Sequence, residues 1–282
     1  MPERSEIAIM SDCLGAKLTG KKCNYVIIFE KYNEAYNGGL YSSSNVFYNQ
    51  GPGYKYINIG SILTKMSSRG KKIIFEFNSV TPNFRFVSSC GMTGRWSWQQ
   101  SNNSLIALVF DDITAYYEHT VMGGIFSVCL YPSPEYEHIF KDVGPDLMTD
   151  EVDFNVYYSI VKRKRIQHME ICLFMMEQKY MSGIGAYLRS EILYRAMINP
   201  HRTLSSLSDK DIYNLFYLSK LIIFETYKSN GLTIQDYLDP NGNVGSYQCY
   251  CYGKNHDNFG NKIIVEKDRN NRNIHWCPVL QN

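Results

Sequence analysis

The hydrophobic pattern of this 282-residue chain changes its period once, and that change constrains the possible folds more than any other feature. From residue 23 to about residue 132, short runs rich in Tyr, Ile, Val and Phe alternate with turn clusters such as SNNS, which predicts strands. The runs are CNYVIIFE, YKYINIG, KKIIFEF, FRFVSS, LIALVFDD, TAYYEH and GGIFSVCLY. Six or more such strands in one segment indicate a β-sandwich or barrel.

The second half of the chain has a helical period instead. A segment rich in Pro, Gly and acidic residues at 132–151 marks the boundary. Beyond it, VYYSIVKRKRIQHMEICLFMMEQ and LSDKDIYNLFYLSKLIIFETYKSNG carry apolar residues at helical spacing, and Ser208 and Asp211 have the spacing of a capping box. Another helix is predicted over 6–19, and Gly20 and Gly231 are expected to end helices. The overall class is therefore α+β.

The last segment, 246–282, is extended again, with SYQCYCYG, KIIVEK and NIHWCPV around a polar tip, KDRNNRN. This pattern predicts a β-hairpin. The eight cysteines are scattered through apolar segments, which favours reduced, buried thiols over a disulfide framework.

Charge is distributed unevenly although the formal net charge is only +2. Residues 1–159 hold 13 basic and 16 acidic side chains, whereas residues 160–230 hold 11 basic and 6 acidic ones. The basic run at 162–165 is either a solvated helix face or part of a nucleic-acid patch. No run of about 18 apolar residues and no secretory leader is visible, so we expect a soluble, intracellular protein without a membrane span.

The chain begins MPERSE, which places a proline directly after the initiator methionine. If Met1 is removed, Pro2 carries a free secondary amine. An α-amino group titrates near pH ~8, about two units below lysine, so part of it is neutral and nucleophilic at physiological pH. Proline at this position is also common without any catalytic role, so the motif needs support from the rest of the chain.

Several separated stretches resemble one family, the formamidopyrimidine-DNA glycosylases and endonucleases VIII. MPERSE resembles their MPEGPE start, RGKKIIFEF their G-K-x-L strand and GMTGRW their G-M-[ST]-G turn. QKYMSGIGAYLRSEILYRAMINPHR resembles their helix-two-turn-helix signature, and NIHWCPVLQ resembles the end of their finger hairpin. The order matches along nearly the whole chain, and the likeness is greatest to endonuclease VIII-like proteins of giant DNA viruses.

The resemblance implies three domains and one activity. A catalytic β-sandwich domain would occupy 1–140, a helix-two-turn-helix DNA-binding domain 150–240, and a degenerate zinc-finger-like hairpin 246–282. The expected activity is that of a bifunctional DNA glycosylase and abasic-site lyase that removes oxidised bases during base excision repair. Its partner would be damaged DNA, single-stranded or duplex, bound by a monomer.

The resemblance also assigns catalytic roles. Pro2 would attack C1′ of the damaged nucleotide and leave a Schiff base. Glu3 would protonate the opening sugar ring, and Glu6 would be a second carboxylate near the lesion or a water. For both glutamates the alternative is stabilisation of a helix dipole. Lys71 would contact the phosphate and assist β-elimination; the alternative is an exposed strand end, and spacing from Gly70 favours Lys71 over Lys72.

Further positions would contact DNA. Met92 falls on the methionine that fills the void left by a flipped base, with core packing as the alternative. Gly183, Ile184 and Gly185 would expose backbone amides as a phosphate cradle. The family asparagine after the second glycine is Ala186 here, so one phosphate contact is missing.

The finger departs from the zinc-binding members. Two C-x-x-C pairs are expected in those members, but this chain reads NHDNFGNK after Lys254 and PVLQ after Cys277, so we expect no zinc and no cofactor. A different site is conceivable because suitable ligand types are present, and Cys249 and Cys251 would share a face if this segment were a strand; the candidates are Cys249, Cys251, His256, His275 and Cys277. Arg272 matches the fingertip arginine that promotes the last elimination. One alternative is that Arg269 has this role, and the other is that Arg272 is an exposed turn arginine without a function. Lys254 and Arg269 would contact DNA phosphates.

A third departure concerns the wedge that family members insert opposite the lesion. Val121 and Gly123 stand where an arginine and an aromatic residue are usual, so we expect a preference for lesions in single strands or bubbles, where unpairing costs less. Two alternatives stay open: a DNA-binding paralogue that has lost catalysis, and a structural protein unrelated to DNA.

Overall fold

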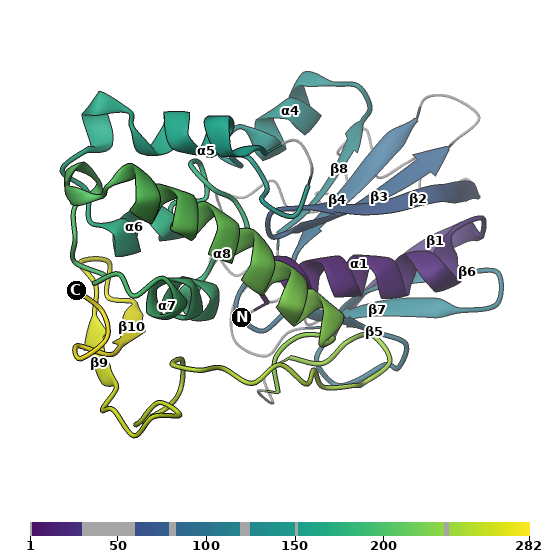
Figure 1. Ribbon diagram of the computed structural model, residues 1–282. Coiled ribbons are helices and arrows are strands. Elements are labelled where there is room, and N and C mark those ends of the chain that lie inside the picture. Colours follow the sequence, from purple (N-terminus) through teal and green to yellow (C-terminus); the bar gives the residue numbers. More distant parts are fainter. Residues whose placement is uncertain (1, 30–59, 79–82, 119–124, 150–151, 234–236) are drawn as a thin grey trace. The chain divides into compact units, whose positions relative to one another are not determined.

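The computed structural model describes residues 2–29, 60–78, 83–118, 125–149, 152–233 and 237–282 (Figure 1). Its elements in the first half are α1 (Arg4–Leu18), β1 (Lys22–Ile28), β2 (Ser61–Arg69), β3 (Lys72–Asn78), β4 (Phe84–Ser89), β5 (Arg95–Ser97), β6 (Ser104–Phe110), β7 (Thr114–Glu118), β8 (Ile125–Leu130) and α4 (Pro134–Phe140). The second half contains α5 (Phe154–Val161), η1 (Lys164–Ile166), α6 (Ile171–Met176), α7 (Ala186–Arg195), η2 (Leu204–Ser206), α8 (Asp209–Lys228), β9 (Ile264–Lys267) and β10 (Asn273–Trp276). The α+β class is confirmed.

The described chain forms two compact units. The first comprises Pro2, Glu6–Lys141 and Thr233–Gly245, and the second comprises Glu3–Ser5, Asp142–Leu232 and Ser246–Asn282. The first three residues after Pro2 thus group with the helical unit rather than with the rest of α1. No helix in the described ranges is both long and apolar enough to cross a membrane.

An antiparallel sheet of eight strands, in the order β5-β7-β6-β1-β2-β3-β4-β8, builds the first unit. In the described residues, the two halves of this sheet join through two residue pairs between β1 and β2. The rings of Tyr117 on β7 and Phe126 on β8, from near opposite edges, lie 4.3 Å apart, so the sheet folds back on itself. Trp96 fills the space between the halves and packs on Phe75 and Tyr117. This arrangement is the expected sandwich.

The sequence pattern located most of these strands but missed the three-residue β5 and the longer β2. The nine residues of β2, SILTKMSSR, pair with β3 over almost their whole length. Only the first and third side chains of β2 are fully buried, so its sequence is too polar to stand out as a strand. The predicted helix at 6–19 is confirmed as α1, whose apolar side chains Ile7, Met10 and Leu14 enter the core of this unit. The predicted strand YKYINIG lies mostly outside the described residues.

The helical unit is less regular than its periodicity predicts. The expected continuous helix over 156–178 is wrong: α5 ends at Val161, and α6 begins only at Ile171. Arg163 has an extended backbone, and the side-chain amide of Gln167 caps the carbonyls of Val161 and Arg163. The basic run 162–165 is therefore not part of a long helix face: it begins in the turn after α5 and ends in the exposed start of η1. The capping box of α8 is confirmed, with Ser208 and Asp211 bonded reciprocally.

The predicted C-terminal hairpin is confirmed as β9 paired with β10. The preceding segment SYQCYCYG, however, contains only one isolated bridge, from Tyr247 to Leu232, and is not a strand. The amides of Ser246 and Tyr247 donate to backbone carbonyls after α8, and those of residues 250–252 donate to the Glu191 side chain.

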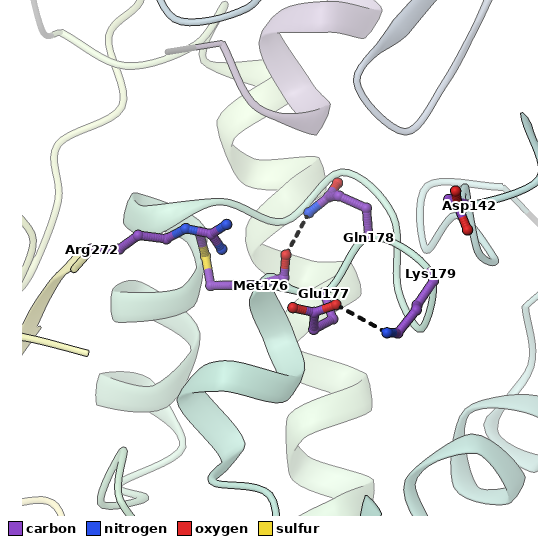
Figure 2. Close-up of a pocket in the computed structure, with 6 residues that line it drawn as sticks. All are labelled: Asp142, Met176, Glu177, Gln178, Lys179 and Arg272. Atoms are coloured by element: carbon purple, nitrogen blue, oxygen red, sulfur yellow. Dashed lines mark hydrogen bonds and ion pairs between the residues drawn. The ribbon is translucent and has the colours of Figure 1, made fainter. Parts of the chain in front are cut away.

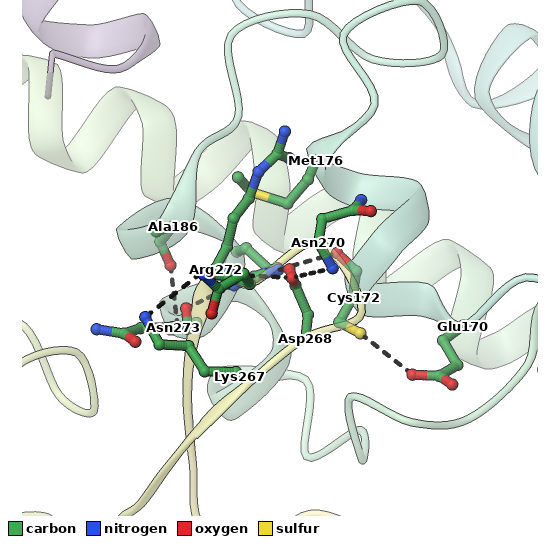
Figure 3. A network of polar contacts seen from close by, with 12 residues as sticks. Glu170, Cys172, Met176, Ala186, Lys267, Asp268, Asn270, Arg272 and Asn273 are labelled. Carbon is green, nitrogen blue, oxygen red and sulfur yellow. Dashed lines mark hydrogen bonds and ion pairs between the residues drawn. The ribbon is translucent and has the colours of Figure 1, made fainter. Parts of the chain in front are cut away.

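A buried ion pair anchors the hairpin to α7. Arg189 Nη1 lies 2.7 Å from Asp268 Oδ2, and both side chains are 0% exposed. The same guanidinium donates to the backbone carbonyls of Asn273 and Cys172 (Figure 3). Asp268 in turn accepts the amides of Asn270 and Arg272, so one carboxylate orders the whole hairpin tip.

We predict that Asp268→Asn destabilises the hairpin by about 3–5 kcal/mol, because it leaves a buried guanidinium without its counter-charge. Hydrogen–deuterium exchange of residues 264–276 measures this loss. The matched control is Asp112→Asn, which breaks the exposed pair with Lys21 and should leave exchange of the hairpin unchanged.

This contribution also depends on pH. Burial alone raises the pKa of Asp268, but the Arg272 amide and the Arg189 charge outweigh it and hold the pKa below its ordinary value. The stabilisation is therefore present above an unfolded pKa of about 3.9 and is lost as the pH falls further. Equal exchange in wild type and variant at pH 7 would contradict the assignment.

Candidate active site

The chain start is held by the beginning of α7. Pro2 and Glu3 are both buried. The Glu3 carboxylate accepts backbone N–H groups from Gly185 at 2.6 Å, Tyr187 at 3.0 Å and Leu188 at 3.2 Å. Amides at a helix start lack intrahelical partners and carry the positive end of the dipole, so they stabilise the ionised carboxylate.

The next two residues are anchored as firmly. The Arg4 amide donates to the carbonyl of Gly183 at 3.0 Å, and its guanidinium forms a buried ion pair with Asp146 at 2.6 Å. The Ser5 hydroxyl bonds to the carbonyl of Ile223 on α8. Residues 3–5 are thus fixed by a carboxylate, an ion pair and a hydroxyl, which leaves the backbone beside Pro2 little freedom.

The expectation of an exposed amide cradle at 183–185 is wrong. The amide of Gly183 donates to Gln178 Oε1, the amide of Gly185 donates to Glu3, and both glycines are buried. Gly183 is required for another reason: its φ is 96°, and a Cβ there would lie 2.7 Å from Cβ of Arg4. The glycines let the chain start approach α7. DNA contact by other atoms of this stretch, including Ala186, stays a prediction.

Glu6 lies in the first turn of α1 and is almost fully buried. The hydroxyl of Tyr237 donates to its backbone carbonyl at 3.4 Å. Burial and the charge of Glu6 raise the pKa of Tyr237 well above its ordinary value, so this phenol stays protonated. The position in the first turn also fits the helix-dipole alternative, so both interpretations of Glu6 remain open.

Lys71 occupies the two-residue turn between β2 and β3. Gly70 precedes it with a φ of 57°, and Arg69 pairs with Lys72 across the turn. A positive φ at the first central position suits glycine in a tight hairpin. Lys71 is partly buried, which does not fit a fully exposed strand end. Burial lowers the pKa of the neighbouring Lys72, which lies in β3.

Met92 sits at the tip of the turn between β4 and β5, and its side chain is 56% exposed. The core-packing alternative is therefore wrong. Both glycines of GMTG shape this turn: Gly91 has a φ of 54°, and a Cβ at Gly94 would collide with the Cys90 carbonyl and the Tyr117 hydroxyl. The motif presents an apolar side chain to solvent on a tightly held loop.

The two fingertip arginines differ in their partners. Arg269 is 77% exposed in its side chain and pairs with Glu170 at 2.8 Å. Arg272 instead lines a pocket of about 340 Å³. Figures 2 and 3 show its guanidinium beside Met176. The remaining lining residues are Asp142, Glu177, Gln178 and Lys179.

Gln178 is the lining residue of this pocket whose side chain is held most firmly. Its amide group bonds to both Gly183 and the carbonyl of Ile184, so the side chain is held at two ends. Lys179 pairs with Glu177 at 3.4 Å on the pocket wall. The pocket is thus lined by two cationic side chains, Arg272 and Lys179, and by Gln178, which contacts Gly183.

Side-chain oxygens hold the finger loops where zinc-binding members carry cysteine pairs. Glu191 accepts the amides of Tyr250, Cys251 and Tyr252 at 2.8–2.9 Å. Gln281 accepts the amide of Cys277 at 2.7 Å. Lys254 follows the first of these loops, is partly buried and donates to Asn258.

The alternative finger metal site finds no geometric support. Cys249 belongs to one apolar cluster, whereas Cys251 and Cys277 belong to another, so the expectation that Cys249 and Cys251 share a strand face is wrong. His275 is buried, and burial followed by the charge of Arg189 lowers its pKa. Within the described ranges, the only group of three metal-ligating side chains that converges is Glu170, Cys172 and His201.

Sequence reasoning missed the anchors of the site. Asp146 and Asp268 lie far from Arg4 and Arg189 in sequence, and no local pattern marks either aspartate as a buried partner. The one available signal was Arg4 itself, which stands where the family start has glycine. Val121 and Gly123, the predicted substitutes for the wedge, lie outside the described residues.

Comparison with known proteins agrees with this geometry. Residues 143–237 match the family model "Formamidopyrimidine-DNA glycosylase H2TH domain". A formamidopyrimidine-DNA glycosylase of a Wolbachia from Brugia malayi is 25% identical, with both chains covered completely. The MutM (Fpg) protein of Thermus thermophilus has a TM-score of 0.84 at 19% identity, covering 99% of this chain and 98% of that one. Lactococcus lactis Fpg in complex with DNA containing an abasic site has a TM-score of 0.81 at 22% identity, covering 99% of each.

The match to the helix-two-turn-helix model, the full-length relatives and the shared fold bear out the likeness inferred from the sequence motifs. Residues 143–237 are a helix-two-turn-helix domain of the formamidopyrimidine-DNA glycosylase type, and the chain is similar to these glycosylases over its whole length.

Proposed function

We propose that this protein is a bifunctional DNA glycosylase and abasic-site lyase of base excision repair. Relatives of the same length carry the name formamidopyrimidine-DNA glycosylase, and structures of the same fold contain damaged DNA. The observation that carries the proposal is the locked chain start. A nucleophile must be held in a fixed position to react efficiently, and residues 3–5 hold the backbone next to Pro2 in that way.

The chemistry runs through the Pro2 amine after removal of Met1. Its nitrogen attacks C1′ of the damaged nucleotide, and the bond from C1′ to the base breaks, so the base leaves. The nitrogen loses its proton, the C1′–O4′ bond opens, O4′ takes a proton, and an iminium ion results. Loss of a proton from C2′ then expels the 3′ phosphate, and a second elimination expels the 5′ phosphate.

Glu3 suits a charge-stabilising role in this sequence. The three amide hydrogen bonds from α7 favour its ionised form, which opposes the predicted proton donation. An anion one residue from Pro2 stabilises the iminium cation. Glu6, the other buried carboxyl near the chain start, is then the candidate donor to O4′.

The remaining residues serve DNA binding and elimination. Exposed Met92 supports the role of filling the space left by a flipped base. Lys71 assists β-elimination at the phosphate, and Arg272 assists the last elimination from its pocket. Lys254 and Arg269 are surface cations that fit phosphate contacts.

We predict that borohydride reduction traps the wild-type protein on DNA with an abasic site, and that peptide mapping finds the adduct on the N-terminal peptide. Pro2→Ala replaces the secondary amine by a primary one and changes the backbone at the nucleophile, so we expect trapping to fall at least about tenfold. Intact-mass analysis of the same sample reports removal of Met1. Loss of Met1 with no adduct on any substrate would favour the DNA-binding paralogue.

The fingertip arginines give a second prediction. Arg272→Ala should leave β-elimination products while lowering the second elimination about tenfold or more, because the pocket loses its cation near the phosphate. Arg269→Ala is the matched control, because Arg269 lies three residues earlier in the same hairpin tip and already pairs with Glu170. Gel analysis of the cleaved ends separates the two products. The opposite pattern, with Arg269→Ala as the defective variant, would move the role to Arg269.

The substrate form gives a third prediction. With Val121 and Gly123 in place of the wedge, cleavage of a lesion in a single strand or bubble should exceed cleavage in a matched duplex about tenfold, since unpairing costs a few kcal/mol. Single-turnover rates on the three substrates, with the same lesion and flanks, test this. Faster cleavage of the duplex would show that another segment supplies the wedge.

A further inference from the structure

A cluster of three metal-ligating side chains lies apart from the residues of the proposed reaction. Glu170 directly precedes α6, Cys172 lies in the first turn of α6, and His201 follows α7. Glu170 Oε2 is 3.2 Å from His201 Nδ1 and 3.7 Å from Cys172 Sγ. One ligand atom from each side chain lies within 4.8 Å of the other two. Figure 3 shows the contact between Cys172 and Glu170.

These spacings suit a tetrahedral metal ion. With bond lengths of about 2.3 Å to sulfur and about 2.0–2.1 Å to nitrogen or oxygen, two ligand atoms at the tetrahedral angle are about 3.3–3.6 Å apart. The two measured separations, 3.2 and 3.7 Å, differ from this range by about 0.1 Å. Glu170 is therefore already at coordination spacing from both partners, and the Cys172 sulfur and the His201 nitrogen lie within 4.8 Å of each other.

The backbone around the cluster is also fixed. Glu170 and Thr203 form an antiparallel bridge. The amides of Ile171 and Cys172 donate to the carbonyls of Arg202 and Pro200 at 2.8 and 3.1 Å. The segment that carries His201 is thus tied to the start of α6 by main-chain hydrogen bonds on both sides.

Outer partners orient the ligands independently of any ion. His201 Nε2 lies 2.6 Å from Glu266 on β9, and Trp276 on β10 donates to the same carboxylate oxygen at 2.7 Å. A carboxylate on the far imidazole nitrogen favours the tautomer with its proton on Nε2, in which Nδ1, now in contact with Glu170, can bind a metal. The second oxygen of Glu170 is held by Arg269 at 2.8 Å.

We propose that Glu170, Cys172 and His201 bind a divalent transition-metal ion of the zinc class, with a fourth position left for water. A thiolate and an imidazole favour such an ion over magnesium or calcium, which prefer oxygen ligands. His201 is partly exposed, which gives an ion access, while Cys172 is buried. The site is separate from the finger loops.

Metal binding there would act on the hairpin. The ion connects the start of α6 to β9 through His201 and Glu266, so it fixes the position of β9. The ion also takes up negative charge from Glu170, which weakens its pairing with Arg269 and leaves that fingertip cation available. Neither effect requires the proposed lyase chemistry, so the inference stands apart from the proposed function.

Cobalt titration of the full chain tests the site, after reduction and treatment with a chelator. A thiolate bound to Co²⁺ gives a near-ultraviolet charge-transfer band. We expect saturation at one Co²⁺ per chain and loss of the band when Zn²⁺ is added. The band should disappear in Cys172→Ser, and affinity should fall at least about tenfold in His201→Gln.

Matched controls separate this site from others. Cys129→Ser removes a buried cysteine of the first unit and should bind Co²⁺ like wild type. Absence of the band in wild type would overturn the proposal. A band that survives in Cys172→Ser but is lost in Cys251→Ser or Cys277→Ser would place the ion in the finger loops and overturn it as well. If Cys172→Ser does not fold, undiminished affinity in His201→Gln, an exposed position, decides against the site.

Discussion

The Glu3 carboxylate on the first amides of α7 is the constraint on which the site depends. It joins residues 182 positions apart in the sequence, so the chain start has its place only when α7 is formed. The same contact explains the glycines of the family signature. Gly183 is needed because Arg4 approaches its backbone closely, and the amide of Gly185 donates to Glu3. The hydrogen bonds that position the chain start are therefore the same ones that cap α7. A substitution of Glu3 or a change at the start of α7 disturbs both.

The fingertip uses a turn that occurs three times in the described chain. In each copy an aspartate accepts the backbone amides two and four residues later, and the residue three positions on has a positive φ. In each copy the aspartate amide also donates to the carbonyl four residues later. A carboxylate thus replaces longer strand pairing as the source of order in these loops. The copies begin at Asp239, Asp257 and Asp268 and have their positive φ at Gly242, Gly260 and Asn271.

The sequence predicted what depends on local pattern. The helix α1, most strands, the α8 capping box and the hairpin follow from periodicity and turn residues within a few positions. It failed where side chains override that pattern. The apolar period continues across 156–178, yet Gln167 caps carbonyls inside the run and the helix stops. The buried pair of Arg189 and Asp268 spans 79 positions, and neither residue differs locally from a surface ion. Motif likeness named Pro2, Lys71 and Met92, but only the fold shows what holds the chain start.

The two arginines of the hairpin tip are held by different contacts. Asp268 fixes the backbone of Arg272 through its amide, and the buried Arg189 fixes Asp268 in turn. Arg272 therefore keeps its position as long as α7 and the hairpin stay joined. Arg269 is held only by its side chain, through the Glu170 carboxylate, which also serves His201. Any change in the charge on Glu170 or His201 alters Arg269 and leaves Arg272 in place. Within the hairpin tip, Asp268 thus fixes the backbone of Arg272, whereas Glu170 holds the side chain of Arg269.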